Sequence, residues 1–540
     1  MRRCRRKGIK GGGILILAVG AFLALHAVPA FAREAVEASA FSALAVTLYR
    51  DPSRGPDEEM DRDWPRGFAM ITETRQVTLP AGESTVRFSG VAEGMVAVSA
   101  IVTGLPGGTI EKNRNADLLS PAALVDGTLG NRVTITRTNP ATGEAASESA
   151  VVRTRSDGGL VLQTAEGFEA VRCSGLPEKL TFDRVPAGLS AQPVFSVDTR
   201  SAEGGTYTVE LTYLAWGFDW QAHYVAHLEE PGRSDRIALR LMSWLTLLND
   251  NGQSFPDAEL LVVAGRLNVV SDFDALSDPP EARPLRLTCY PLGSTAAGTP
   301  ENYPPPPPPP PPAPAPMMSD SIVVTAQRAA GFAASSPLAV IAVEEAVGDL
   351  KLYRVPERVT VSAKGLKQVA FLDRDGVEGR LLYTTRCTPS EDTEEAVPTA
   401  MLLATVNDRK HGLGMALPMG GITLFEPGAA GDLLIGENRL RDYAEGQDVE
   451  IALGESSQVF GQCTAPEARE RERWSPRVVL TNANRMPAKV RVVLGRSADW
   501  RFTGLRGTSV KDGEVIVETT VPGNGRRELA WIARPAGAAD

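Results

Sequence analysis

The chain has 540 residues, with 56 Lys and Arg against 66 Asp and Glu, and its formal charge is −10. A chain of this length exceeds what a single hydrophobic core supports, so we expect two to four domains. The acidic balance, without a basic stripe, argues against nucleic acid and against anionic lipid surfaces as partners.

The N-terminus has the pattern of an export signal. Six basic residues lie between Arg2 and Lys10, Ile14–Val28 is an apolar run, and Ala30–Ala32 matches an A-x-A cleavage site. An uncleaved membrane anchor is the alternative. Cleavage after residue 32 leaves 50 basic and 66 acidic residues, a formal charge of −16. No later stretch approaches the ~18 apolar residues that cross a bilayer. We therefore expect an exported protein, in the periplasm or, as the alternative, outside the cell.

The next segments in chain order carry a period of two. Thr206–Tyr213 places Tyr207, Val209, Leu211 and Tyr213 on one face, as in a half-buried strand. Similar runs occur at Arg132–Thr138, Val359–Leu372, Lys489–Leu494, Glu514–Val521 and Arg527–Ala533. Turn signals lie at Pro106–Gly108, Asn249–Gly252, Asp373–Gly376 and Lys511–Gly513. The pattern predicts an all-β, multidomain antiparallel architecture of sandwiches or barrels.

Helical signals are few. Ser120 is suited to cap a short helix, Pro121 to begin it, and Gly127 to end it in the left-handed conformation. A second helical pattern covers Val340–Leu350. Composition divides the mature chain into β regions at 33–200, 201–292, 339–466 and 467–540, with a Pro-rich linker at 293–338.

The linker contains nine consecutive prolines, Pro304–Pro312, which predict an exposed polyproline II rod roughly 40 Å long with the Ala-Pro residues that follow. Ser319–Arg328, which we call the contact strand, comes directly after it. This segment resembles the energy-coupling box of TonB-dependent receptors, an extended peptide that adds a strand to a partner's sheet. The residues expected to pair are Ile322, Val323, Val324, Thr325 and Ala326. The alternative is a linker that docks as an edge strand on its own domain.

Four cysteines follow the signal: Cys173, Cys289, Cys387 and Cys463. None has the C-x-x-C spacing of a zinc or redox site. In an oxidising compartment, the pairing that respects the domains is Cys173–Cys289 with Cys387–Cys463, one of three possibilities. Unpaired thiols remain an alternative.

Candidate chemistry is sparse. His223 and His227 lie on a predicted strand, where their Cα atoms are ~13 Å apart, too far to share a metal ion. The acidic run Asp57–Asp63 has the alternation of a calcium loop, and the run Glu391–Glu395 is also acidic, but solvated loops explain both. We find no nucleophile elbow, Walker loop or dinucleotide fingerprint, and we expect no metal and no cofactor. Trp216, Trp220, Tyr224 and Trp244 form an aromatic group that either fills a core or offers a sugar-binding surface.

Scattered motifs also resemble a family. They are Asp117–Pro121, Leu211–Tyr224, Asn251–Leu261, Ala264–Gly265, Tyr353–Thr360, Lys367–Val369, Gly412–Gly414, Leu417–Pro418 and Gly436–Glu437. Together they resemble a secreted bacterial domain-of-unknown-function family related to the mucoidy inhibitor A-like proteins. The resemblance implies an all-β protein at the cell envelope and, in some relatives, a link to exopolysaccharide. It implies no catalytic residues, and the coiled coil of several relatives has no counterpart here.

These observations predict a non-enzymatic, exported cell-envelope protein that acts through protein–protein contacts, with the contact strand as one of them. A TonB-like envelope protein is the partner that this strand suggests. The alternative function is a polysaccharide-binding module or an envelope-glycan hydrolase, for which a groove lined by aromatic residues and two carboxylates is required.

Overall fold

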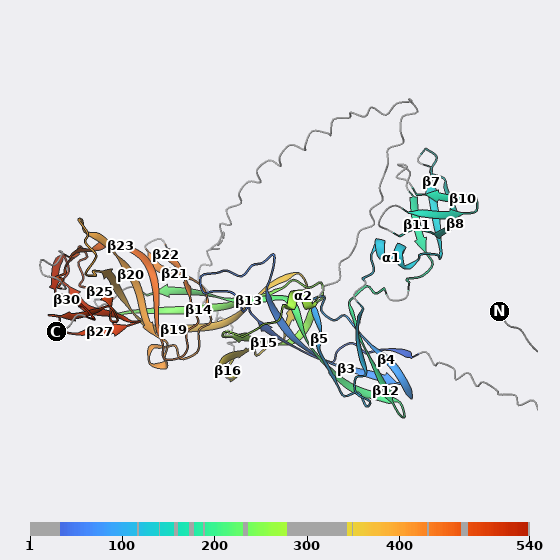
Figure 1. The fold of residues 1–540 in the computed structure, drawn as a ribbon, viewed down its shortest axis with the longest axis horizontal. Helices are drawn as coiled ribbons and strands as arrows, with labels where there is room; N and C mark the ends of the chain where they lie inside the picture. Colours follow the sequence, from blue (N-terminus) through green and yellow to red (C-terminus); the bar gives the residue numbers. More distant parts are fainter. Residues whose placement is uncertain are drawn as a thin grey trace, which may run out of the picture.

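The computed structural model describes residues 33–115, 118–139, 141–155, 160–171, 178–186, 189–229, 236–277, 343–347, 349–428, 431–465 and 473–537. The fold is all-β with several sheets, as the sequence predicts, and the elements other than α1 and β7–β11 extend along one long axis (Figure 1). In the described part of the chain, no helix is long and apolar enough to cross a membrane.

A four-stranded sheet lies near one end of the molecule (Figure 1). Its strands, in spatial order, are β1 (Glu34–Glu37), β4 (Gly82–Ser89), β12 (Val194–Ser201) and β6 (Glu111–Asn115). Val86, Phe88, Phe195 and Val197 are buried and belong to the largest hydrophobic core. This sheet therefore packs on the strands that supply the rest of that core.

Those strands form the first part of one large branched sheet. They are β2 (Ala43–Tyr49), β3 (Gly67–Leu79), β5 (Met95–Thr103), β13 (Gly205–Leu228), β15 (Phe255–Ala264), β16 (Val343–Val347), β17 (Leu350–Arg354) and β18 (Val359–Val361). The order of pairing is β16-β17-β15-β2-β3-β13-β5, and β18 also pairs with β15. The short helix α2 (Phe273–Ser277) follows β15.

The long strand β13 carries the sheet into the middle of the molecule. Buried residues alternate with less buried ones in both halves of β13, and the alternation shifts by one residue at a bulge at Gly217 between the halves. The first half pairs with β3 and β5, and the second half pairs with β14 and, in parallel, with β21. The middle strands are β14 (Arg236–Asn249), β19 (Gly365–Arg386), β20 (Val397–Val406), β21 (Gly420–Gly428), β22 (Gly431–Leu440) and β23 (Asp448–Thr464), with the turn η1 (Arg409–His411).

The C-terminal strands form a sandwich with a second core. They are β24 (Arg477–Asn482), β25 (Ala488–Arg496), β27 (Thr508–Lys511), β28 (Glu514–Val521) and β29 (Gly525–Ala530), with the separate pair β26 (Trp500–Thr503) and β30 (Ile532–Pro535). One layer continues from β19 into β25, β28 and β27, and the other from β23 into β24 and β29. A disulfide joins Cys387, just after β19, to Cys463 of β23, and so links the two layers. This is the second of the two bridges expected from the sequence.

A small unit has its own core and stands apart from the other strands in Figure 1. It contains α1 (Pro121–Gly127) and the sheet of β10 (Gly167–Ala170), β9 (Val161–Thr164), β8 (Ala145–Val152), β7 (Arg132–Thr138) and β11 (Glu178–Phe182). Ser120 caps α1 as predicted, because its Oγ accepts the N–H of Ala123. The predicted left-handed end at Gly127 is wrong, since the helix ends at Thr128 with φ −100°. Gly127 instead provides space: a Cβ there would lie 2.8 Å from Pro186 Cβ.

Two further local predictions are wrong for reasons of pairing. The helix predicted over Val340–Leu350 is wrong where the structure describes this range: Val343–Val347 forms β16, which pairs with β17, so tertiary pairing overrides the helical spacing. Residues 340–342 and 348 lie outside the described part of the chain. The hairpin turn predicted at Asp373–Gly376 is a β-bulge inside β19. Arg240 of β14 lies opposite the bulge and binds the carboxylates of both Asp373 and Asp375, at 2.9 and 3.1 Å.

Other local predictions hold with adjusted bounds. The run Val359–Leu372 is divided into β18 and β19 by a turn at Lys364, which has φ 45°. The turn predicted at Lys511–Gly513 connects β27 to β28, with positive φ at Asp512 and Gly513. β7 and β28 have the predicted bounds.

The sheets group the chain differently from its composition. β13, β14 and β15 precede the Pro-rich linker, and they pair directly with β21, β19 and β17, which follow it. The predicted ranges 201–292 and 339–466 therefore share one sheet and one core. Within 33–200, the small unit is separate, whereas β2, β3 and β5 belong to the large sheet.

Candidate functional site

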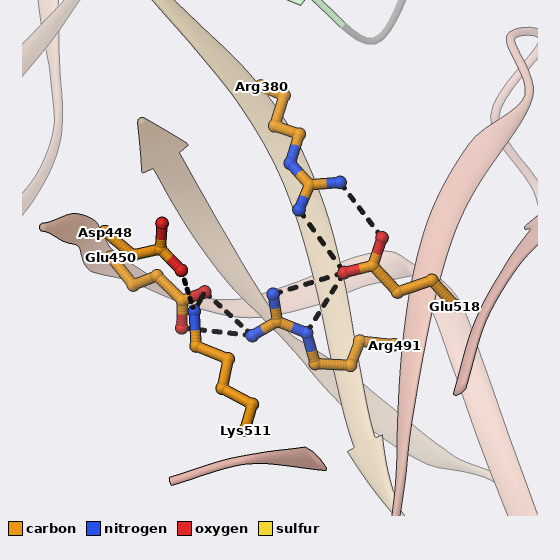
Figure 2. Close-up of polar contacts among 6 residues, drawn as sticks. All are labelled: Arg380, Asp448, Glu450, Arg491, Lys511 and Glu518. Atoms are coloured by element: carbon orange, nitrogen blue, oxygen red, sulfur yellow. Dashed lines mark hydrogen bonds and ion pairs between the residues drawn. The ribbon is translucent and has the colours of Figure 1, made fainter. Parts of the chain in front are cut away.

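A charged groove of about 490 Å³ lies where the middle strands meet the C-terminal sandwich. Six side chains in it form a connected set of ion pairs, which we call the clip network: Arg380 of β19, Asp448 and Glu450 of β23, Arg491 of β25, Lys511 of β27 and Glu518 of β28 (Figure 2).

Arg491 is the centre of the clip network. Its buried guanidinium lies 2.8 Å from Glu450 Oε1 and 3.2 Å from Glu518 Oε1 (Figure 2). Lys511 Nζ lies 2.6 Å from Glu450 and 3.0 Å from Asp448. Burial raises the pKa of Glu518, but the contacts with Arg380 and Arg491 outweigh it, and the pKa lies below its usual value. The acidic and basic side chains thus neutralise one another. We therefore interpret the network as a structural clip that joins β23 to the strands β25, β27 and β28.

A second hollow, of about 640 Å³, has a different character, and we call it the aromatic pocket. Tyr49, Phe68 and Trp216 are cross-strand neighbours on the adjacent strands β2, β3 and β13. The rings of Tyr49 and Phe68 stack at 4.7 Å, and the ring of Phe273 from α2 meets Phe68 edge-on at 4.9 Å. Phe68, Trp216 and Phe273 line the pocket.

This aromatic row projects from the face of the sheet opposite the main core. The residues that alternate with it, Leu48, Ala69 and Ala215, are all members of the core. Trp216 lies at a β-bulge, where Gly217 is the extra residue with φ +84°. Bulges re-aim neighbouring side chains, so the glycine bulge helps to set the direction of Trp216 at the end of the row.

Charged groups border the pocket. Arg66 comes just before β3, and Arg266 follows β15 in the segment that leads to α2. Among the described residues, neither guanidinium has an ion-pair or hydrogen-bond partner. Asp51 uses one oxygen to accept the N–H and the hydroxyl of Ser53, and Asp272 accepts the N–H of Ala275. The pocket therefore combines aromatic rings, two unpaired cations and carboxylates with free accepting capacity.

A buried ion pair holds the loop that forms one wall of the pocket. Arg54 Nη1 donates to Asp219 Oδ2 at 2.8 Å, and both side chains are almost fully buried. Asp219 Oδ1 accepts the backbone N–H of Asp51 and of Trp220. Burial raises the pKa of Asp219 to about 6, although Arg54 and these N–H groups oppose the shift. The pair fastens residues 51–54 to β13.

Most residues singled out from the sequence do not meet in one site. The contact strand with Ile322–Ala326, and Cys173 and Cys289, lie outside the described residues. His223 and His227 lie on β13 as expected: His223 faces Gly421, and His227 stacks on Phe425 at 5.2 Å. No group of three or more potential metal-ligating side chains occurs in the described part of the chain.

The predicted acidic and aromatic groups are divided between roles. Within Asp57–Asp63, Asp61 accepts the N–H groups of Asp63 and Trp64, so its carboxylate shapes the loop. Trp220 and Tyr224 are fully buried in the main core. Trp216 lines the aromatic pocket and is the one member of the predicted group that does so. The sequence reasoning missed Phe68, Phe273, Arg66 and Arg266, because they come from distant segments that carry no motif.

No protein-family model matches this chain, and no curated protein matches it. The resemblance to the mucoidy inhibitor A-like proteins therefore stays a prediction.

Proposed function

We propose that this protein is a non-enzymatic, exported protein of the cell envelope that acts in the periplasm through protein–protein contacts. The observation that supports this function is the sheet edge at which the chain re-enters the described fold after the linker. β16 pairs with β17 along one edge, and no described strand pairs with the other. An unpaired edge offers backbone N–H and C=O groups to another strand. The contact strand precedes β16 in the same segment of chain, so strand pairing with a partner suits this architecture.

The test compares the mature protein with a variant in which residues 317–330 are replaced by a Gly/Ser stretch of equal length. The replacement keeps the reach of the linker and removes the β-branched residues. Crosslinking in the native envelope identifies the partner, and binding is then measured with the purified pair. We expect the variant to keep its circular dichroism and melting temperature and to lose the partner. Unchanged binding by the variant would refute a role for the contact strand.

A second candidate function, polysaccharide binding, is favoured by a separate observation. The aromatic row of Tyr49, Phe68 and Trp216 projects away from the core and ends in a pocket with two arginines that have no partner among the described residues. Phe68 is buried within this group, and Trp216 and Phe273 keep partly exposed ring surface in the pocket that can stack on a sugar ring. Binding of purified envelope polysaccharide to the protein, compared with a Trp216→Ala variant of confirmed fold, tests this function.

A further inference from the structure

We propose that the aromatic pocket binds an acidic sugar residue, a ring that carries a carboxylate, within a polysaccharide. This inference rests on the second candidate function and names its ligand. It follows from three properties of the pocket: its aromatic floor, its unpaired cations and its continuity with a neighbouring hollow.

The floor suits the face of a sugar ring. The C–H groups on one face of a pyranose carry partial positive charge, and the faces of aromatic rings carry partial negative charge. Phe68 and Trp216 lie side by side on β3 and β13, and Phe273 approaches from α2. Phe68 is only 3% exposed, because the rings of Tyr49 and Phe273 pack against it, whereas Trp216 and Phe273 are only partly buried. Trp216 and Phe273 are therefore the rings of the pocket that a ligand can cover.

The pocket is lined by two arginines and two aspartates; the aspartates accept hydrogen bonds from Ser53 and Ala275, so the arginines are the groups available to bind an anion. In the clip network each guanidinium has acidic partners, whereas Arg66 and Arg266 have none among the described residues. A guanidinium binds a carboxylate through two parallel N–H···O bonds. The remaining polar groups of the lining, among them Asp51, Asn268 and Asp272, are suited to hydroxyl groups. The lining thus matches a ring with one carboxylate and several hydroxyls better than it matches a neutral ring.

A smaller hollow of about 140 Å³ extends the site. It shares Trp216 with the aromatic pocket, and its other lining residues include Trp64, Asp250 and Lys364. Trp64 is 53% exposed, in the same loop as Arg66. Two hollows that share one tryptophan suit a ligand longer than one sugar residue, which is why we propose a polymer.

The test uses a tetramer of galacturonic acid as the probe and its neutral methyl ester as the matched ligand. Binding to the full mature chain is measured by titration calorimetry. We expect the acid to bind about tenfold more tightly than the ester, because one charge-assisted contact is worth about that factor. The Arg66→Ala/Arg266→Ala variant should lose this preference, and Arg66→Lys/Arg266→Lys should keep part of it. Arg527→Ala, an exposed arginine of β29 outside the pocket, is the control and should bind as wild type.

Three outcomes overturn the inference. Equal binding of acid and ester by the wild type shows a site for neutral glycans, which leaves the second candidate function standing. Competition by inorganic phosphate at equal potency shows a simple anion site. Binding of neither tetramer removes the pocket as a site for such glycans. None of these results bears on the proposed function in protein–protein contacts, because the replacement of residues 317–330 tests that function separately.

Discussion

At the scale of single residues, Asp219 and Arg54 show how a buried charge supports a surface pocket. Arg54 belongs to the loop of residues 51–54, and Asp219 of β13 binds it. The carboxylate of Asp219 also accepts the N–H of Asp51. Burial disfavours the charged form of Asp219, so the folded protein takes up a proton at a higher pH than the unfolded chain does. The cost of this arrangement should be visible as a dependence of stability on pH.

We predict that Asp219→Asn changes this dependence. The pKa of Asp219 rises from about 3.8 to about 6 on folding, so its contribution to stability is full below pH 3.8 and is lost as the pH rises through 6. The total is about 3 kcal/mol at 1.36 kcal/mol per pKa unit. Urea unfolding between pH 4 and pH 7 should show a smaller fall in free energy for Asp219→Asn than for wild type. Asp57→Asn, in an exposed loop, serves as the control, and identical slopes for all three proteins would contradict the prediction.

At the scale of elements, the clip network and the disulfide join strands that the backbone does not pair. Arg491 and Glu518 are cross-strand neighbours on β25 and β28, but Glu450 belongs to β23, which pairs with neither strand. The disulfide likewise joins the end of β19 to β23 across the C-terminal sandwich. Both contacts depend on side chains brought together by packing of the two layers.

Arg491→Met should destabilise the protein by about 2–3 kcal/mol, because it removes the buried cation that Glu450 and Glu518 share and leaves them only Lys511 and Arg380. The cost is below that of a fully buried pair, since Glu450 and Glu518 are about a quarter exposed. Arg386→Met is the matched control: its pair with Glu514 is largely exposed, and its loss should cost less than about 1 kcal/mol. Guanidinium unfolding measures both variants. A smaller loss for Arg491→Met than for the control would show that the network is not a clip.

Cys387→Ala/Cys463→Ala should lower the stability of the C-terminal sandwich by about 4.5 kcal/mol, the chain-entropy value for a sequence separation of 76. Both residues are buried, so part of the effect is lost packing. Melting of wild type with dithiothreitol should reproduce most of the shift. In the double variant, any response to the reductant measures the predicted Cys173–Cys289 pair, whereas an unchanged melting temperature of wild type in dithiothreitol would contradict the prediction.

At the scale of the whole molecule, the large sheet contains strands from both sides of the Pro-rich linker. Strands from both sides of the linker share the main core and pair edge to edge, both parallel and antiparallel. The two sides of the chain therefore form one folding unit, although their composition suggests separate domains. The small unit of β7–β11 has a core of its own.

We predict that cutting the linker does not separate the two sides. A protease site that replaces residues 317–330 allows the folded protein to be nicked after purification. Because β13, β14 and β15 pair with β21, β19 and β17, both fragments should co-elute on size exclusion and separate only in denaturant. The same protein without the protease provides the control. Fragments that separate in native buffer would contradict the continuous sheet.

The predictions that the structure confirms are those that depend on interactions between residues close in sequence. β7 and β28 have the predicted bounds because their alternation and flanking turns agree with their pairing. Ser120 caps α1 because the cap depends only on residues within one turn. Predictions from the sequence were wrong where the conformation depends on a neighbouring strand. Val343–Val347 forms a strand because it pairs with β17, and Asp373–Gly376 forms a bulge opposite Arg240 of β14.

The candidate site was predicted only in part for the same reason. The sequence indicates Trp216 as a candidate, because other aromatic residues lie near it in the chain. Phe68, Arg66, Arg266 and Phe273 carry no local signal, and they reach Trp216 only because β3 pairs with β13 and α2 folds back after β15. The clip network has five contributing strands and likewise no motif.

The sequence by itself determined that this chain is all-β, since period-two alternation and turn residues act over a few positions. The tertiary structure alone decided which strands are neighbours. It therefore decided that strands before and after the linker belong to one sheet, and that an aromatic row faces away from the core. Pairing between distant strands depends on burial of both partners at once, a property of the assembled core that no single segment contains.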